Sequence, residues 1–201
     1  MRRRLGTQHG RPRVTSPAPD EPGSIEERLQ RLEARFAIND LVAAYCAAID
    51  GRDLDSFVDC FTADAVLRHE DGVMRLEGRE TIREYYEARF PTYGVTFHYP
   101  HAQTVVLDGP DAAHGVVTAH AEMALEGEAW LAAFRYSDTY RREQGRWRFA
   151  ERVLACWYYM RLSDLADGLA SPLRKHYRGR QLAAELPERL ASFRAWREGS
   201  A

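Results

Sequence analysis

Two side chains that could transfer a proton stand in unusual surroundings, namely Asp50 and His98. His98 interrupts an otherwise apolar and aromatic segment, and a carboxylate bound to one nitrogen of its ring would make the other nitrogen a better base. Asp50 precedes Gly51 at the end of a predicted helix, where the helix dipole disfavours an acidic side chain, so we expect another group to compensate it. The residues alone also allow a core histidine bonded to a backbone carbonyl, and an aspartate satisfied within its own turn.

The segment that ends at Asp50 is predicted to be a long amphipathic helix, from about Ile25 to Ile49. Ser24 and Glu27 have the spacing of a capping box at its start. Apolar residues recur at three- and four-residue steps along its second half: Phe36, Leu41, Val42, Tyr45, Cys46 and Ile49. This pattern predicts that one side of the helix faces the core.

Two shorter helices and six strands are predicted after this helix. The helices are expected over Leu54–Phe61 and Arg79–Phe90. Turn residues bound the six strands, which are Ala65–His69, Val73–Glu77, Val95–Leu107, Ala113–Glu126, Trp130–Arg142 and Arg146–Met160. Short turns make consecutive strands antiparallel neighbours, and helices on one side of such a sheet form an α+β domain. His98 lies in the first of the four long strands.

The two ends of the chain differ from this central part in composition. Residues 1–23 are rich in Arg, Pro and Gly, which predicts a disordered N-terminal tail. Residues 24–165 form the predicted domain. Residues 166–201 form a C-terminal extension that is expected to be partly helical, with an amphipathic helix over Gln181–Trp196 that Pro187 interrupts.

Composition is typical of a soluble globular protein. The 201 residues are 45% apolar and 29% charged, and the net charge of −2 gives no electrostatic reason to expect nucleic acid or an anionic membrane as partner. The basic N-terminus lacks the apolar core of a signal peptide, which favours a cytoplasmic location. The three cysteines lack the spacing of metal ligands, and His101 is expected to face away from His98 unless Pro100 bulges the strand. We therefore expect no metal site.

The order of elements and two sequence motifs resemble the nuclear-transport-factor-2-like superfamily. One motif is AAYCAAIDGRDLDSFVDCFTADAVL, with an aspartate before a helix break, and the other is RYSDTYRREQGRWRFAER in the predicted last hairpin. The resemblance covers about Ile25–Leu165 and is strongest to the SnoaL-like branch, which includes scytalone dehydratase, bile-acid 7α-dehydratase and hexachlorocyclohexane dehydrochlorinase. It implies a cone-shaped, curved antiparallel sheet that three helices wrap around a deep central pocket.

The resemblance also implies catalytic residues. Enzymes of this branch remove water or hydrogen halide with a His–Asp pair and without metal or organic cofactor, and the positions of that pair correspond to Asp50 and His98. Tyr45 and Arg152 match two further positions, as a hydrogen-bond donor and as a group that stabilises an oxyanion. Tyr45 could equally be a core aromatic residue. For Arg152 the alternative is a surface arginine, and Arg148 and Arg161 are its rivals.

Several residues of the predicted sheet are candidates for contact with substrate. His120 matches a second histidine that some dehydratases of the family carry, although it could also belong to an outward polar face. Aromatic residues suit a pocket for a hydrophobic cyclic molecule, although some are expected in the core. The candidates are Phe97, Phe134, Tyr136 and Tyr158.

These observations together predict a cofactor-independent lyase or isomerase, similar to a dehydratase, that acts on a hydrophobic cyclic small molecule. His98 would remove a proton, Asp50 would orient it, and Tyr45 or Arg152 would assist the leaving group. A polyketide-type cyclase with the same residues is one alternative, and a non-catalytic small-molecule-binding or assembly subunit is another. We further expect a homodimer or homotrimer.

Overall fold

The structure is a computed structural model that describes residues 23–199. Residues 1–22, which make up nearly all of the predicted N-terminal tail, and residues 200–201 lie outside the described part. Within that part, no helix is both long enough and apolar enough to cross a lipid bilayer.

The first helix, α1 (Ile25–Gly51), starts at the predicted capping box. The backbone N–H of Glu27 donates to Oγ of Ser24 at 3.2 Å, and the N–H of Ser24 donates to Oε2 of Glu27 at 2.7 Å. The second half of the helix buries Ile38, Leu41, Val42, Tyr45, Ala48 and Ile49. Phe36, which was predicted to begin this apolar side, is 68% exposed, because the first half of α1 extends past the core.

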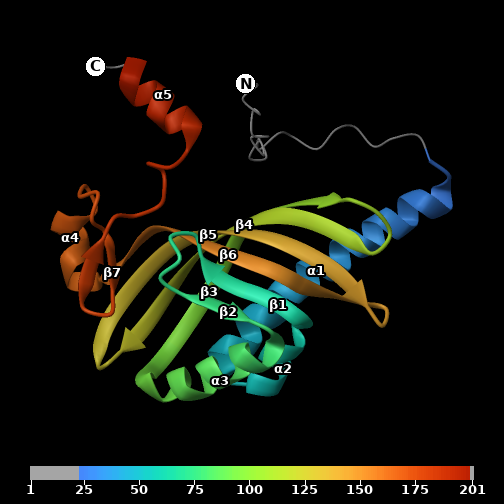
Figure 1. The fold of residues 1–201 in the computed structure, drawn as a ribbon, viewed down its shortest axis with the longest axis horizontal. Coiled ribbons are helices and arrows are strands. Elements are labelled where there is room, and N and C mark those ends of the chain that lie inside the picture. Colours follow the sequence, from blue (N-terminus) through green and yellow to red (C-terminus); the bar gives the residue numbers. More distant parts are fainter. Residues whose placement is uncertain (1–22, 200–201) are drawn as a thin grey trace, which may run out of the picture.

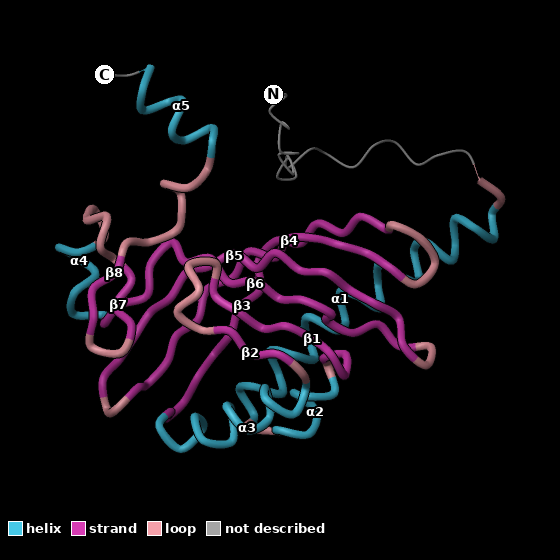
Figure 2. Tube along the Cα trace, in the orientation of Figure 1, coloured by secondary structure: helices cyan, strands magenta, loops and turns pink. Residues whose placement is uncertain are grey.

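The sheet is a curved layer whose long strands bend together (Figures 1 and 2). Its strands are β1 (Phe61–His69), β2 (Arg75–Glu77), β3 (Tyr93–Leu107), β4 (Ala112–Leu125), β5 (Glu128–Glu143), β6 (Arg146–Arg161), β7 (Lys175–Tyr177) and β8 (Arg180–Leu182). The order is β2-β1-β6-β5-β4-β3, and all neighbours are antiparallel except β1 with β6 and β6 with β7. The predicted α+β cone is thereby confirmed.

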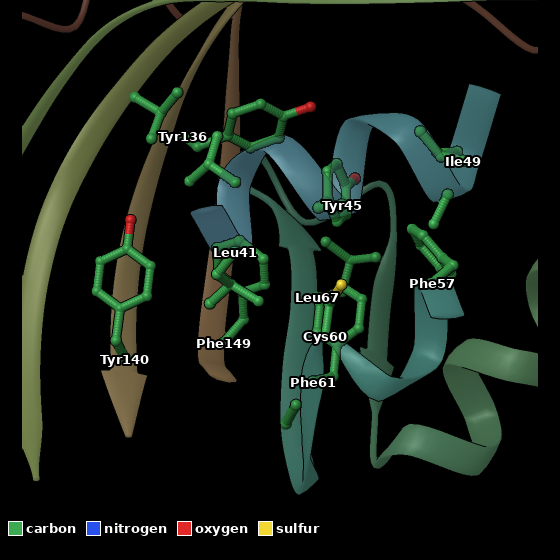
Figure 3. Packing of buried hydrophobic residues seen from close by; sticks show 14 of the residues in the cluster. Leu41, Tyr45, Ile49, Phe57, Cys60, Phe61, Leu67, Tyr136, Tyr140 and Phe149 are labelled. Atoms are coloured by element: carbon green, nitrogen blue, oxygen red, sulfur yellow. The ribbon is translucent and has the colours of Figure 1, made fainter. Parts of the chain in front are cut away.

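Two short helices, α2 (Leu54–Asp59) and α3 (Arg79–Arg89), lie together at one end of the sheet, while α1 runs along it (Figure 1). Figure 3 shows the resulting core, in which the ring of Tyr45 on α1 is surrounded by aromatic residues. The ring centroid of Tyr45 is 5.2 Å from that of Phe57 on α2, 6.0 Å from Phe61 on β1 and 5.6 Å from Phe149 on β6. Aromatic packing therefore joins the end of α1 to the sheet.

The C-terminal part of the chain differs from its prediction. A 3-10 turn (Leu162–Asp164) and a short helix, α4 (Leu165–Gly168), lead into the β7–β8 hairpin, and α5 spans only Ala191–Gly199. The predicted helix over Gln181–Trp196 is therefore wrong in its first half. Glu185 in that stretch is fully buried and binds the ammonium group of Lys175, which also donates to Asp71 at 2.9 Å. This buried ion cluster holds the C-terminal segment against the turn that follows β1.

Candidate active site

Asp50 and His98 lie within hydrogen-bonding distance where α1 ends beside β3. Nδ1 of His98 is 2.6 Å from Oδ1 of Asp50, and the backbone N–H of His98 donates to Oδ2 at 2.8 Å. Both side chains are mostly enclosed, with exposed fractions of 23% for Asp50 and 12% for His98. Because Nδ1 faces the carboxylate, it carries the proton of the neutral ring, and the lone pair of Nε2 is left to accept another proton.

Thr96 and Arg52, which the sequence did not single out, position Asp50. Oγ1 of Thr96 donates to Oδ1 of Asp50 at 2.9 Å, and Nη1 of Arg52 donates to Oγ1 of Thr96 at 2.8 Å. Arg52 also donates to the carbonyl oxygens of Ile49 and Gly94, which fastens the end of α1 to the start of β3. Thr96 could have been found by alternation along the strand, because residues two apart face the same side.

The surroundings of Asp50 favour its ionised form. Burial alone would raise the pKa of this carboxyl group, but hydrogen bonds from the side chain and backbone of His98, and from Thr96, lower the pKa below its ordinary value. A carboxylate at this place can stabilise the imidazolium that forms when His98 takes up a proton. The arrangement is therefore able to perform general base chemistry.

His98 and Thr96 line a cavity of about 100 Å³ between α1, α3 and the concave side of the sheet, and Asp50 is linked to it through its hydrogen bond to His98. Two of the predicted substrate-binding residues, Phe134 and Tyr136, lie in its wall. Aromatic side chains make up much of this wall: Tyr45, Tyr85, Tyr86, Tyr93, Phe134, Tyr136, Tyr159 and Tyr177. Such a wall suits a flat, mostly apolar molecule.

Tyr45 lies in the cavity wall and is almost fully buried. Burial raises the pKa of its hydroxyl well above the ordinary value. The hydroxyl therefore remains protonated at neutral pH, and it interacts with the side chain of Tyr136. The geometry is compatible with both roles considered for Tyr45, because its ring packs against core aromatic residues and also forms part of the cavity wall.

Arg152 lies beneath the cavity and is not part of its wall. Its Nε and Nη2 each donate to the carboxylate of Asp138 at 3.0 Å, and both side chains are fully buried. The guanidinium carbon is 4.3 Å from the ring centroid of Tyr45 and 3.8 Å from that of Tyr136. Because Asp138 balances the charge and the two rings cover it, this geometry does not support the predicted contact of Arg152 with a substrate oxyanion.

The two rivals of Arg152 are also bound elsewhere. Nη2 of Arg148 donates to Oδ1 of Asp59 at 2.7 Å, and Nε of Arg161 pairs with Oε2 of Glu128 at 2.5 Å. Neither side chain lines the cavity. All three arginines of β6 that were candidates for catalysis therefore form ion pairs with carboxylates of the protein.

Two of the predicted substrate-binding residues face the outer side of the sheet. Phe97 precedes His98 in β3, so alternation places it on the opposite face, where it is 47% exposed. His120 pairs with Tyr99 across β3 and β4, and its Nδ1 is 2.6 Å from Nε2 of His101. His120 therefore lies on the outward polar face of the sheet, which was one of the two positions considered for it from the sequence.

Tyr158 is turned away from the cavity by a β-bulge. In the pairing of β5 with β6, Ala133 lies opposite Tyr158 but Phe134 lies opposite Cys156, which leaves Trp157 without a partner. The extra residue shifts the alternation by one position, so Tyr159 lines the cavity while Tyr158 lies in a shallow outer depression. Regular alternation along the strand predicts the reverse.

A second histidine, His69 at the end of β1, also lines the cavity. Its ring is 5.4 Å from that of Tyr177, and its buried Nδ1 has no hydrogen-bond partner among residues 23–199. Burial and the nearby charge of Lys175 lower the pKa of His69 to about 4, so the ring is neutral at pH 7. No sequence pattern pointed to this residue, because it lies at the end of an ordinary short strand.

We predict that His69 makes the fold sensitive to mild acid. Its pKa is near 6.5 in the unfolded chain, so below that pH the unfolded state binds the proton first and stability is lost as the pH falls toward 4. The expected loss is about 2 kcal/mol at about pH 5. Urea denaturation at neutral pH and at about pH 5 should show this loss in the wild type and its absence in His69→Gln. An equal pH dependence of the two proteins would contradict the prediction.

A larger hollow lies elsewhere. It has a volume of about 1160 Å³ and runs between α1 and the loops that join β3 to β4 and β5 to β6. No histidine of residues 23–199 belongs to its lining, so volume alone does not indicate the site of chemistry. Across residues 23–199, no group of three or more His, Cys, Asp or Glu side chains is arranged to hold a metal ion.

Comparisons with known proteins agree with this architecture. A family model described as the SnoaL-like domain matches residues 30–153. The structure of a type 2 hexachlorocyclohexane dehydrochlorinase is 25% identical with a TM-score of 0.61, over 67% of this chain and 93% of that protein. A candidate aromatic ring hydroxylase from Novosphingobium aromaticivorans is 27% identical with a TM-score of 0.61, over 68% and 98%. A candidate scytalone dehydratase from the same species shares the fold at 17% identity, with a TM-score of 0.63 over 66% and 90%.

Proposed function

The chain belongs to the SnoaL-like domain family, and from this premise we propose that it is a cofactor-independent lyase or isomerase, similar to a dehydratase. The substrate would be a hydrophobic cyclic small molecule. The observation that carries the proposal is the 2.6 Å contact between Asp50 and His98 at the wall of an aromatic cavity. A histidine oriented by a buried carboxylate is a general base whose second nitrogen is free for a substrate.

In the proposed reaction, Nε2 of His98 removes a proton from a carbon next to an electron-withdrawing group. The electrons of that C–H bond form a carbon–carbon double bond, and the bond from the neighbouring carbon to the leaving group breaks. Asp50 stabilises the imidazolium during this step. A hydroxyl group departs as water after it accepts a proton from Tyr45 or from the imidazolium, whereas a halide departs without one.

The volume of the cavity limits the size of the substrate. An engineered protein cavity of about 150 Å³ holds one benzene molecule, and the cavity beside His98 has about 100 Å³. Without movement of the wall, the reacting part of the substrate is therefore no larger than a single small ring.

The proposal can be tested without knowledge of the natural substrate. Six-membered ring ketones that carry a hydroxyl or halide on the β carbon, each with and without a carboxylate substituent, are incubated with the protein in D₂O and followed by NMR. We expect the wild type to accelerate elimination, or deuterium exchange at the α carbon, for at least one of them. A set of ketones that eliminate and exchange no faster than they do without protein would overturn the proposal.

We also infer that the protein is a homodimer or homotrimer. The inference is supported by apolar side chains that are exposed on the outer face of β3 and on the first half of α1: Val95, Phe97, Tyr99, Ile25, Leu29, Leu32 and Phe36. Such a surface in contact with water favours association. Size-exclusion chromatography with light scattering should give a mass of two or three chains, and a monomer at all concentrations would contradict the inference.

A further inference from the structure

Arg89 is a positive charge in the cavity wall without a matching negative charge. It lies in the last turn of α3, where its Nε donates to the hydroxyl of Tyr93 at 3.3 Å and its guanidinium carbon is 5.1 Å from that ring centroid. In the part of the chain that the structure describes, it makes no ion pair with a carboxylate. Arg83 on the same helix instead pairs with Asp55 at 2.8 Å. The two terminal nitrogens of Arg89 are therefore left for another acceptor.

A second guanidinium group adds to the positive potential. The guanidinium carbon of Arg52 is 5.7 Å from the ring centroid of Tyr93, so both arginines pack against the same ring. Arg52 uses its hydrogen bonds to hold the end of α1, whereas within residues 23–199 the side chain of Arg89 has only the one to Tyr93. Among the described residues, Arg52 also has no carboxylate within ion-pairing distance. Arg89 is thus the arginine that remains able to bind a ligand.

The rest of the cavity lining does not balance these two charges. Among residues 23–199, no aspartate or glutamate belongs to the lining, and Asp50 beside it is bound to His98. A guanidinium group carries its positive charge at any physiological pH. In an aromatic and partly enclosed site, such charges act more strongly than in water, so the cavity should attract anions and should disfavour cations.

We propose that the substrate carries a carboxylate group, which the terminal nitrogens of Arg89 bind. The planar fork of a guanidinium group matches the two oxygens of a carboxylate. Hydroxyl groups in the same part of the wall belong to Tyr85, Tyr93 and Tyr177, and those of Tyr85 and Tyr177 are 3.5 Å apart. The inference rests on the proposed function for the reaction at His98, and it narrows the substrate class to small-ring carboxylic acids.

The test compares benzoate with benzamide, which have nearly the same shape but differ in charge. Neither has a leaving group, so binding is measured without turnover, by chemical-shift titration of the full-length protein at low salt and neutral pH. We expect the wild type to bind benzoate about tenfold more tightly than benzamide, since hydrogen bonds between charged groups contribute this much. Arg89→Gln should abolish the preference, and Arg89→Lys should retain part of it.

Arg83→Gln is the matched control, because it removes the same charge from the same helix outside the cavity. It should leave the preference for benzoate unchanged. Equal affinities for the two probes, an absence of saturable benzoate binding, or an unchanged preference in Arg89→Gln would each overturn the inference. The probes do not react, so none of these results bears on the proposed chemistry of His98, which the ketone assay tests separately.

Discussion

Replacement of His98 by glutamine is expected to lower kcat by about a thousandfold while the protein stays folded. Glutamine can keep a hydrogen bond to Asp50, but its amide nitrogen cannot accept a proton, so the general base is lost and the shape of the site is retained. Turnover should be measured on the ring ketone that the wild type converts fastest, together with the thermal unfolding midpoint of both proteins. A variant that unfolds normally and keeps kcat within a few-fold would exclude His98 as the base.

His114 provides a matched control for this substitution. Its Nδ1 is 2.8 Å from Oδ2 of Asp108, so the chain contains a second His–Asp pair, but that pair is exposed at the turn between β3 and β4. His114→Gln should leave kcat unchanged. Asp50→Asn should lower kcat by about a hundredfold or more, because the amide no longer stabilises an imidazolium at His98. Equal effects of the His98 and His114 substitutions would show that the loss is not specific to the cavity.

The proximity of Asp50 and His98 followed from two local features of the sequence together with the family resemblance. An acidic residue at a helix end needs a partner, and a lone histidine in an aromatic strand needs an acceptor. The helices and strands around them were predictable because apolar residues repeat at helical or strand spacing over most of the domain. For example, the third helix was predicted over Arg79–Phe90 and spans Arg79–Arg89.

The features that were missed depend on contacts between distant parts of the chain. The bulge at Trp157 reverses the orientation of Tyr158 and Tyr159, and no turn residue marks it in the sequence. The apolar spacing after Gln181 fits a helix, yet the chain ends a strand at Leu182 and then forms an irregular segment and a turn, in which Glu185 binds Lys175 in the core. Arg89 gave no signal, since an arginine in the last turn of a helix is usual on a protein surface.

Arg152 has a structural role at a position where the family resemblance implied a catalytic one. Its guanidinium group is buried beneath Tyr45 and Tyr136, and the ion pair with Asp138 is what makes that position tolerable. A buried charge that loses its partner is strongly destabilising, whereas a buried pair replaced by apolar groups is often neutral. Stability measurements can therefore distinguish the loss of one partner from the loss of the whole ion pair.

Asp138→Asn is expected to lower the free energy of unfolding by about 3–5 kcal/mol. The amide oxygen still accepts the hydrogen bond that Tyr140 donates at 3.0 Å, so the loss comes mainly from the unbalanced charge of Arg152. The double variant with Arg152→Met should recover most of this loss, since it removes that charge. Urea denaturation of the single and double variants measures both effects.

Asp64→Asn is the matched control, because it breaks an ion pair whose aspartate is 70% exposed. It should lower the free energy of unfolding by only about 0–1 kcal/mol. A double variant as unstable as Asp138→Asn would contradict the argument, because the destabilisation would then not arise from the charge of Arg152.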